Sequence, residues 1–445
     1  MQPSPERGEW GSKIGFIFAA AGSAIGLGNI WRFPYVTGQN GGAAFVLIYL
    51  ACVFFICLPY LLGEFALGRH TQRDPVGAIK AIRPNSPWVL VGALCVLTGI
   101  SILSYYSVIA GWVLGYVVKS ITHNPQPFEA FIASPGTVLF YFLLFILLTI
   151  LVVYGGIQQG IERWSRLLMP VLLVLMLVVI IRSLTLEGAS KGLSFYLNPD
   201  FSKVTGRTVL EALGQAFFSL SLGMGTMLTY GSYLSKKDNL VSSGAYVALF
   251  DTAIALLAGL MIFPALFALG KAPDAGPKLV FVVLPELFQE MPMGSIVGVA
   301  FFLLLAIAAL TSTISLLEVP VAYLVDNKRW QRKHAVWAAG ALSLLLGIPS
   351  ALSQGAVPWL SSLPFFDGRS FLDLMDFIWG NIALAVGAMF LSIFIGWVWG
   401  IDKAIEEIEQ GCPSFRQYGT TWGLFIRYVC PAVIFIVLLN IVQVF

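Results

Sequence analysis

The chain has 445 residues, of which 58% are hydrophobic and only 11% are charged, and its mean hydropathy is +0.84. This composition excludes a soluble globular domain, which needs more polar residues to cover its surface, and it indicates a polytopic membrane protein. The formal net charge of +3 is divided among short segments rather than massed on one domain, so no nucleic-acid partner is expected.

Apolar windows of roughly 20 residues recur along the chain, and this length crosses a hydrocarbon core of about 30 Å. They predict an all-α integral membrane protein with about eleven spanning helices in a single transmembrane domain, residues 1–445. The predicted spans are 12–36, 42–68, 88–121, 137–155, 163–184, 209–233, 240–269, 294–325, 333–354, 371–400 and 419–444. The apolar stretch 279–288 is too short to cross, and we expect it to form a helical hairpin over the outer mouth.

The basic residues are unevenly divided between the two sides that these spans define. Sixteen lie in the segments on the side of the amino terminus and eight on the opposite side, with Arg32 and Arg427 inside spans. The positive-inside rule therefore predicts a multi-pass cell-membrane protein with its amino terminus in the cytoplasm. A signal peptide is an alternative interpretation of the first apolar run, but Glu6 and Glu9 argue against it.

The first span contains a stretch, residues 22–34, that does not suit a continuous helix. Gly22, Gly26, Gly28 and Pro34 are poor helix formers within it. Asn29 and Arg32, in the same stretch, carry polar groups that a lipid-facing helix does not hold. We therefore predict that the helix breaks here. A break at membrane depth is tolerated only beside a buried or water-filled cavity, so this stretch is a candidate binding site.

The sixth predicted span carries a similar interruption, Ser219-Leu220-Ser221-Leu222-Gly223-Met224-Gly225. Breaks in the first and sixth helices indicate two five-helix repeats, about 12–184 and 209–400, followed by an extra helix at about 419–444. Because five is odd, the second repeat must be inverted, and paired breaks point to a midplane substrate site. Glycine pairs also occur where helices pack closely, so this feature alone leaves both interpretations open.

Several motifs together resemble bacterial members of the neurotransmitter:sodium symporter family over nearly all of residues 7–400. They are Gly26-Leu27-Gly28-Asn29, Arg32-Phe33-Pro34, Asn40-Gly41-Gly42, Tyr105-Tyr106, Gly214-Gln215-Ala216-Phe217-Phe218 and Leu310-Thr311-Ser312. The resemblance implies the inverted five-plus-five fold with unwound helices 1 and 6. It also implies two sodium sites, because unwound backbone supplies carbonyl ligands without the burial of many charges.

By this resemblance, the ligands of each sodium ion come from several helices. The first site is expected to use Ala24, Asn29, Ser219 and Asp251 together with the substrate carboxylate, and the second Gly22, Ile25, Ala308, Thr311 and Ser312. The alternative for the hydroxyl groups is bonding back to their own helices, which is common in membrane spans.

The resemblance also places the substrate. Family members that carry amines have an aspartate at the position of Gly26, so glycine implies a substrate with its own carboxylate. The substrate-binding residues are expected to be Ala24, Leu27, Gly28, Ile102, Tyr106, Phe218, Ser219, Ser221, Met224 and Leu316. Because Met224 is unbranched and adaptable, it suggests a pocket for aromatic as well as branched side chains, although plain helix packing remains the alternative for these apolar residues.

Asp251 is the main departure from the family pattern. Other members have an amide here and a glutamate one turn later, where this chain has Ala255. An intramembrane carboxylate is a functional hypothesis by default. We expect Asp251 to compensate the sodium charge, so that chloride is not required. Glu64 is a second candidate, with hydrogen bonding to the unwound backbone of span 6 as its alternative.

Two gates and a flexible segment complete the expectations from the resemblance. Arg32 and Asp376 are expected to approach each other above the substrate, and Arg7 and Asp326 on the cytoplasmic side. The remaining gate residues are Trp10, which would anchor the amino-terminal segment, and Tyr233, near the inner pair. Gly160 and Pro170 bracket a segment of helix 5 that is predicted to unwind, with a static proline kink as the alternative.

The sequence therefore predicts a sodium-coupled symporter that takes up hydrophobic L-amino acids by alternating access. The expected partners are the amino acid, sodium and the lipid bilayer, and the sequence leaves the oligomeric state open. A membrane sensor that binds its ligand without transporting it is the alternative. An enzyme is not expected, because the polar residues show no nucleophile–base or metal-ligand spacing.

Overall fold

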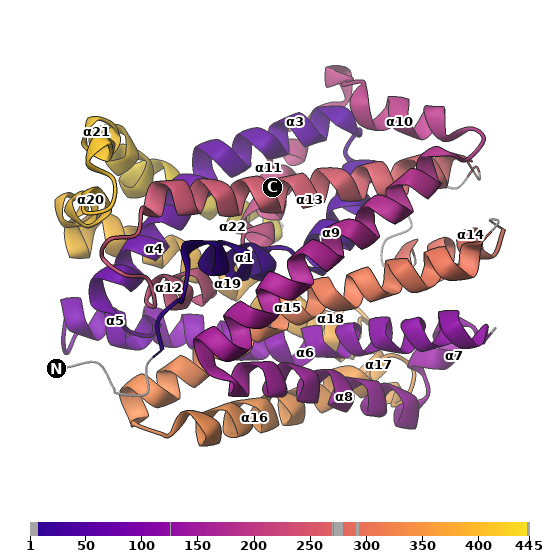
Figure 1. Ribbon diagram of the computed structural model, residues 1–445, viewed down its shortest axis with the longest axis horizontal. Coiled ribbons are helices and arrows are strands. Elements are labelled where there is room, and N and C mark those ends of the chain that lie inside the picture. Colours follow the sequence, from indigo (N-terminus) through magenta and orange to yellow (C-terminus); the bar gives the residue numbers. More distant parts are fainter. Residues whose placement is uncertain (1–7, 125, 269, 271–278, 291–292, 443–445) are drawn as a thin grey trace.

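The computed structural model describes residues 8–124, 126–268, 270, 279–290 and 293–442, and these residues form helices and connecting segments without a β-strand. The long helices run roughly along one direction (Figure 1), and the central α6 and α15 pack against each other. Short helices lie at the two ends, with α5, α20 and α21 at one and α7 and α10 at the other (Figure 1). The all-α fold class is confirmed.

The first part of the chain forms five helical segments that match the first five predicted spans, with short helices between them. The α-helices are α1 (Lys13–Ala24), α2 (Phe33–Gln39), α3 (Ala43–Cys52), α4 (Leu58–Thr71), α5 (Pro75–Ile82), α6 (Val89–Thr122), α7 (Phe128–Ile132), α8 (Pro135–Tyr154) and α9 (Arg163–Leu184). Wider π-helical turns, η1 (Gly28–Arg32), η2 (Val53–Cys57) and η3 (Ile157–Glu162), join some of them.

The middle of the chain begins with a connecting helix that was not predicted, α10 (Ala189–Leu197), which packs on α13. The other elements here are η4 (Phe201–Lys203), α11 (Gly206–Ser219), α12 (Thr226–Gly231), α13 (Leu240–Ala268), η5 (Leu279–Val283), α14 (Leu284–Glu290) and α15 (Gly294–Lys328). The predicted hairpin at 279–288 is a single helical stretch, η5 with α14, within the described residues. Whether a second arm precedes it lies outside them.

The last part of the chain contains α16 and two long, locally widened helices. The elements are α16 (Arg332–Leu352), α17 (Pro358–Ser361), η6 (Pro364–Phe366), α18 (Phe371–Met375), η7 (Asp376–Ala383), α19 (Leu384–Ile393), η8 (Phe394–Gly400), α20 (Ile401–Glu409), η9 (Pro413–Phe415), α21 (Arg416–Leu424), η10 (Phe425–Val429) and α22 (Cys430–Ile441). The predicted span 371–400 ended too early and the predicted span 419–444 began too late, because the helical segments Phe371–Glu409 and Pro413–Ile441 extend into polar sequence that apolar windows exclude.

Nine helical segments in the described residues are long and apolar enough to cross a membrane, and a bent pair supplies a tenth. The predicted span 209–233 is present as two shorter helices, α11 and α12, so it is not counted among these ten segments. The breaks in the first and sixth spans, predicted from their glycines, are both present. The repeat boundaries stay a prediction.

The break in the first span separates α1 from η1 and α2. Helix α1 ends at Ala24, Ile25 is extended with φ −73° and ψ 106°, and the two halves are bent by 53°. The side chain of Asn29 stabilises the break, because its Oδ1 accepts a hydrogen bond from the Gly26 amide at 3.1 Å. A local polar side chain thus replaces the helical partner that the amide has lost.

The break in the sixth span lies between Ser219 and Thr226. Ser221, Gly223 and Gly225 have φ of +53°, +80° and +80°, which the glycines adopt without strain. A Cβ at Gly223 would lie 2.8 Å from the Leu384 carbonyl, so the backbone also needs glycine to approach this neighbour. The two interruptions therefore follow from local sequence.

Candidate functional site

Three polar side chains predicted as first-site sodium ligands meet in the interior. Asn29 Nδ2 donates to Ser219 Oγ at 2.9 Å and to Asp251 Oδ1 at 2.7 Å, and Ser219 Oγ donates to Asp251 Oδ2 at 2.8 Å. Their exposed fractions are 0%, 1% and 0%, respectively. Ala24 stands at the end of α1, beside the same break. A buried carboxylate is costly unless it is paired, and here hydrogen bonds from two helices compensate Asp251.

The helix ends explain why these groups converge. Asn29 lies in η1 directly after the first break, Ser219 is the last residue of α11 before the second, and Asp251 lies on α13. Among the described residues, no group of three or more His, Cys, Asp or Glu side chains could hold a metal ion. The oxygen atoms that meet here are those of the Ser219 hydroxyl and the Asp251 carboxylate, because Asn29 turns its Nδ2 toward them and its Oδ1 toward the Gly26 amide.

The residues predicted for the second sodium ion also lie together, between α1 and α15. Ser312 Oγ lies within hydrogen-bond distance of three carbonyls, those of Ser23 at 3.2 Å, Ile25 at 3.3 Å and Ala308 at 3.3 Å. Thr311 Oγ1 donates to the Ala308 carbonyl at 3.0 Å. Gly22 lies against this helix, because a Cβ there would be 3.1 Å from Thr311 Cβ. The hydroxyl groups of Thr311 and Ser312 therefore lie close to a carbonyl of their own helix, which is the alternative that the sequence left open. Ser312 also contacts carbonyls at the end of α1.

The predicted carboxylate-binding groups surround the first break. The Leu27 amide donates to Tyr106 Oη at 2.9 Å, so this hydroxyl already lies at the unwound backbone. A Cβ at Gly26 would be 2.8 Å from the same hydroxyl and 2.6 Å from Ser312 Oγ, and one at Gly28 would be 2.8 Å from Phe218 Cε1. At both positions a Cβ would come closer than 3.0 Å to a neighbouring atom, so the packing around the break requires glycine.

The predicted ammonium and side-chain contacts come from four helical segments. Ser221 Oγ donates to the Ser23 carbonyl at 3.0 Å, which joins the two breaks directly. Ile102 on α6, Met224 in the second break and Leu316 on α15 are buried, with exposed fractions of 3–4%. Phe218 is half-buried and also lines a cavity of about 900 Å³ bounded by α11, η7 and α22.

The predicted outer pair is not formed in this structure. Among the described ion pairs within 4.0 Å, none joins Arg32 to Asp376. The Arg32 guanidinium lies 4.9 Å from the centre of the Phe218 ring, and Asp376 accepts a hydrogen bond from Tyr105 Oη at 3.0 Å. Arg32 thus contacts the Phe218 ring, and Asp376 contacts Tyr105, instead of each contacting the other. Arg32 and Phe218 line the same 900 Å³ cavity.

The inner gate is only partly described, because Arg7 lies outside the described residues. Asp326 accepts a hydrogen bond from the Asp74 amide at 2.9 Å. Trp10 Nε1 donates to the Tyr230 carbonyl at 3.0 Å, which fastens the amino-terminal segment to α12. Tyr233 Oη donates to Glu318 Oε1 at 2.7 Å.

Glu64 takes the position that the sequence analysis gave as its alternative. Its carboxylate accepts hydrogen bonds from the Gly223 amide at 2.8 Å and the Leu228 amide at 3.2 Å. These amides lack helical partners because the sixth span is interrupted between Ser219 and Thr226. Glu64 therefore stabilises the second break, as a carboxylate stabilises a helix amino terminus.

The segment of helix 5 between Gly160 and Pro170 is wound in this structure. Gly160 lies in the π-helical turn η3, and Pro170 lies inside α9. Glu162, between them, accepts from the Gly11 amide and from Ser12 Oγ, both at 2.7 Å. The amino-terminal segment is thus tied to the part of helix 5 that is predicted to unwind.

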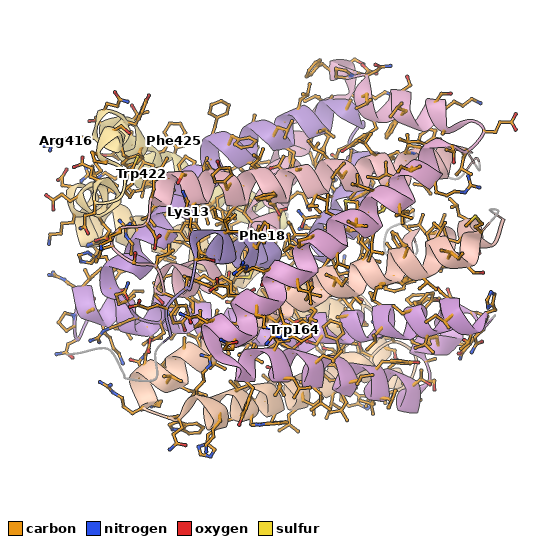
Figure 2. The ribbon with its side chains drawn as sticks, in the orientation of Figure 1. Lys13, Phe18, Trp164, Arg416, Trp422 and Phe425 are labelled. Carbon is orange, nitrogen blue, oxygen red and sulfur yellow. The ribbon has the colours of Figure 1, made fainter. Side chains whose placement is uncertain are left out.

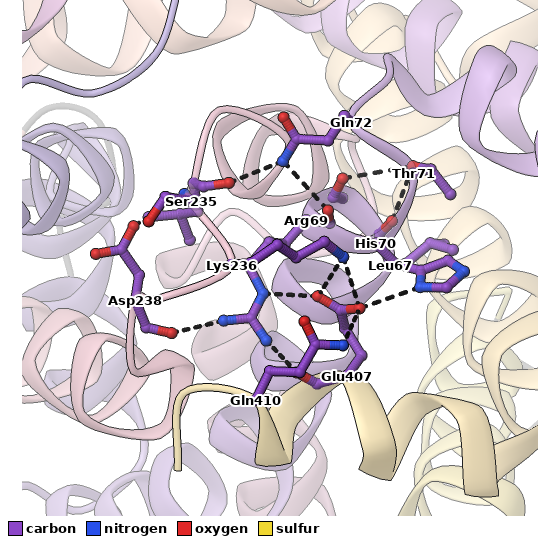
Figure 3. Close-up of polar contacts among 12 residues, drawn as sticks. Leu67, Arg69, His70, Thr71, Gln72, Ser235, Lys236, Asp238, Glu407 and Gln410 are labelled. Carbon is purple, nitrogen blue, oxygen red and sulfur yellow. Dashed lines mark hydrogen bonds and ion pairs between the residues drawn. The ribbon is translucent and has the colours of Figure 1, made fainter. Parts of the chain in front are cut away.

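A charged cluster outside the predicted site joins α4, the loop after α12, and α20 (Figure 3). Glu407 Oε1 accepts from Arg69 Nε at 2.7 Å and from Lys236 Nζ at 2.9 Å, and His70 Nδ1 lies 3.1 Å from Oε2. Arg69 also donates to the Asp238 carbonyl at 2.5 Å. The Arg69 and Glu407 side chains are only 0% and 1% exposed, so this is a buried ion pair.

Sequence reasoning missed Tyr49 and this charged cluster. Tyr49 Oη donates to Ser219 Oγ at 3.2 Å and lies 3.4 Å from Asp251 Oδ2, so it belongs to the first polar cluster. A tyrosine in a span is also common as packing, and nothing local distinguishes it. Arg69 and Glu407 are 338 positions apart, so no local pattern pairs them.

Comparison with known proteins gives consistent matches over nearly the whole chain. The profile described as "Sodium:neurotransmitter symporter family" matches residues 7–129 and 126–445. The sodium-dependent transporter YhdH of Bacillus subtilis is 42% identical over 98% of this chain and 97% of its own length. A sodium-dependent transporter of Haemophilus influenzae is 35% identical over 98% of both chains. The crystal structure of MhsT in complex with L-phenylalanine is 47% identical, with a TM-score of 0.89 over 98% of this chain and 100% of that one.

Proposed function

The chain belongs to the sodium:neurotransmitter symporter family and is a multi-pass, sodium-dependent transporter, and from this premise we propose that it takes up hydrophobic L-amino acids, branched-chain and aromatic, together with sodium. One observation carries the proposal: Asn29, Ser219 and Asp251 converge where two helices break, beside the Leu27 amide and Tyr106. The relative MhsT, whose solved structure contains L-phenylalanine, supports the substrate class.

In the proposed mechanism, sodium and substrate complete each other's binding sites. The first sodium ion is held by the Ala24 carbonyl, Asn29, Ser219 and Asp251, and the substrate carboxylate supplies the remaining ligand. Because the two share an interaction, each raises the affinity for the other by the same factor. The second ion, held between α1 and α15 at Thr311 and Ser312, stabilises the bent form of the first span.

The amino acid itself is recognised at both ends in this proposal. Its carboxylate accepts from the Leu27 and Gly28 amides and from Tyr106, and the positive end of the half-helix favours the negative charge. Its ammonium donates to carbonyls at the breaks and to Ser221. Its side chain lies among Ile102, Phe218, Met224 and Leu316, and the adaptable Met224 admits both branched and aromatic shapes.

Alternating access follows from gates at opposite ends of the site. Closure of the outer gate brings Arg32 toward Asp376, and Phe218 then covers the substrate. Opening of the inner gate, at Trp10, Arg7 and Asp326, faces the cytoplasm in the orientation that the basic residues predict. Unwinding between Gly160 and Pro170, with release of Glu162, gives water a path to the second sodium ion.

A transport experiment tests this function against the sensor alternative. Purified protein in liposomes is expected to accumulate labelled L-phenylalanine when an inward sodium gradient is imposed, and not with potassium in its place. Competition by the twenty amino acids then ranks the substrates. Sodium-dependent binding without accumulation would instead identify a sensor, and binding indifferent to sodium would refute both sodium sites.

A further inference from the structure

Arg427 lies inside a membrane-spanning helix and has no place in the proposed transport mechanism. It is the only charged residue in 417–445 and lies in η10, five residues beyond Trp422. At 1.5 Å per residue, this places Arg427 about 7–8 Å beyond the polar sequence that precedes Trp422. An arginine inside a span is costly and is usually paired or functional.

The partners of Arg427 leave most of its guanidinium unused. Its Nε donates to the Gly396 carbonyl at 3.0 Å, and its Cζ lies 5.6 Å from the centre of the Trp397 ring. Within the described part of the chain, its two terminal nitrogens have no hydrogen-bond partner and no carboxylate within 4.0 Å. The arginine is therefore a fixed, uncompensated cation with its planar fork free to bind an anion.

Helix geometry fixes the arginine in this position. Gly396 lets the side chain lie against η8, because a Cβ there would be 3.0 Å from Arg427 Cγ. Trp397 Nε1 donates in return to the Arg427 carbonyl at 3.2 Å. The site is built by contacts in both directions between two helices, η8 and η10.

The surroundings of Arg427 are those of a membrane interface. Trp397 and Tyr428 are 55% and 53% exposed on the outer surface of the bundle, and their rings meet edge to face at 5.4 Å. Tryptophan and tyrosine prefer the level of the lipid headgroups. Trp397 lies five residues before Asp402, where charged sequence begins, so it is at the same depth as Arg427. This corner of the molecule is marked by Arg416, Trp422 and Phe425 in Figure 2.

We propose that Arg427, Trp397 and Tyr428 form a binding site for an anionic phospholipid of the cytoplasmic leaflet. The free guanidinium fork matches two oxygens of one phosphodiester, and the aromatic rings pack along the glycerol and upper acyl chains. A lipid with a net negative head group compensates the cation. A zwitterionic lipid carries a cationic group in its head group, and no carboxylate among the described residues at this position neutralises that charge.

The test measures lipid binding by the full-length protein, without transport. Delipidated protein in detergent is titrated with phosphatidylglycerol, phosphatidylcholine or inorganic phosphate, and the thermal midpoint and retained lipid are measured. Phosphatidylglycerol is expected to stabilise the wild type and to be retained, and the other two are not. Arg427→Gln is expected to weaken phosphatidylglycerol binding about tenfold, and Arg427→Lys less, because lysine keeps the charge but not the fork.

Arg416→Gln is the matched control, because Arg416 lies about three helical turns earlier in the same segment, Pro413–Ile441, and its side chain is 84% exposed. It is expected to bind phosphatidylglycerol like the wild type. Equal losses in Arg416→Gln and Arg427→Gln would overturn the site in favour of general surface charge. Equal binding of phosphatidylcholine, or competition by inorganic phosphate, would overturn the anionic lipid as the ligand. If Arg427→Gln does not fold, phosphatidylglycerol binding is measured in Trp397→Ala and Arg427→Lys instead. Binding by both variants that equals the binding by the wild type would refute the proposal.

Discussion

The replacement of Gly26 by alanine tests whether the first break is the centre of the site. The added Cβ would lie 2.6 Å from Ser312 Oγ and 2.8 Å from Tyr106 Oη, closer than carbon and oxygen approach without strain. Neither oxygen can move freely, because Ser312 Oγ is surrounded by the carbonyls of Ser23, Ile25 and Ala308 and Tyr106 Oη accepts from the Leu27 amide. Overpacking of this kind costs about 1–3 kcal/mol. That cost corresponds to roughly a 5- to 150-fold loss of affinity.

The assay is equilibrium binding of labelled L-phenylalanine at a series of sodium concentrations. Both the substrate affinity and the apparent sodium affinity are expected to fall in Gly26→Ala, because the methyl group contacts residues of both predicted sites. Gly136→Ala is the control, since nothing lies within 4 Å of its Cβ position in α8. Binding within about twofold of the wild type in Gly26→Ala would refute the assignment of the site to this break.

Three further predictions concern buried carboxylates. Wild-type uptake is expected to continue unchanged when gluconate replaces chloride, and a chloride requirement would contradict the role of Asp251. Asp251→Asn should weaken sodium-dependent binding about 10- to 150-fold, because a hydrogen bond to a charged group contributes a free energy of that size. Glu64→Gln places an amide group among the Gly223 and Leu228 amides and should destabilise the protein by about 1–3 kcal/mol, seen as a lower thermal midpoint, and an unchanged midpoint would argue against its structural role. Glu407→Gln leaves Arg69 buried without its anion and should cost about 3–5 kcal/mol, whereas Glu406→Gln, at an exposed position, should be neutral; equal midpoints for the two variants would refute the buried pair.

The sequence by itself determined the features that depend on neighbouring residues. Apolar length located the spans, because the bilayer thickness sets it. Glycine spacing located both breaks, because the loss of helix propensity at Gly26 or Gly223 is a local property. The family motifs then predicted which residues around the breaks meet, and Asn29, Ser219 and Asp251 lie together as those motifs implied.

Only the tertiary structure decided which distant groups become partners. Asn29 and Asp251 are 222 positions apart, and Tyr49 completes their cluster although its sequence surroundings are those of a packing residue. Arg32 contacts Phe218 instead of Asp376, and Glu64 binds backbone amides rather than standing as a free charge. The partner of each polar group depends on which donor or acceptor lies nearest once the helices have packed. The free-energy cost of an unsatisfied polar group inside a membrane protein exceeds the conformational preference of any single residue.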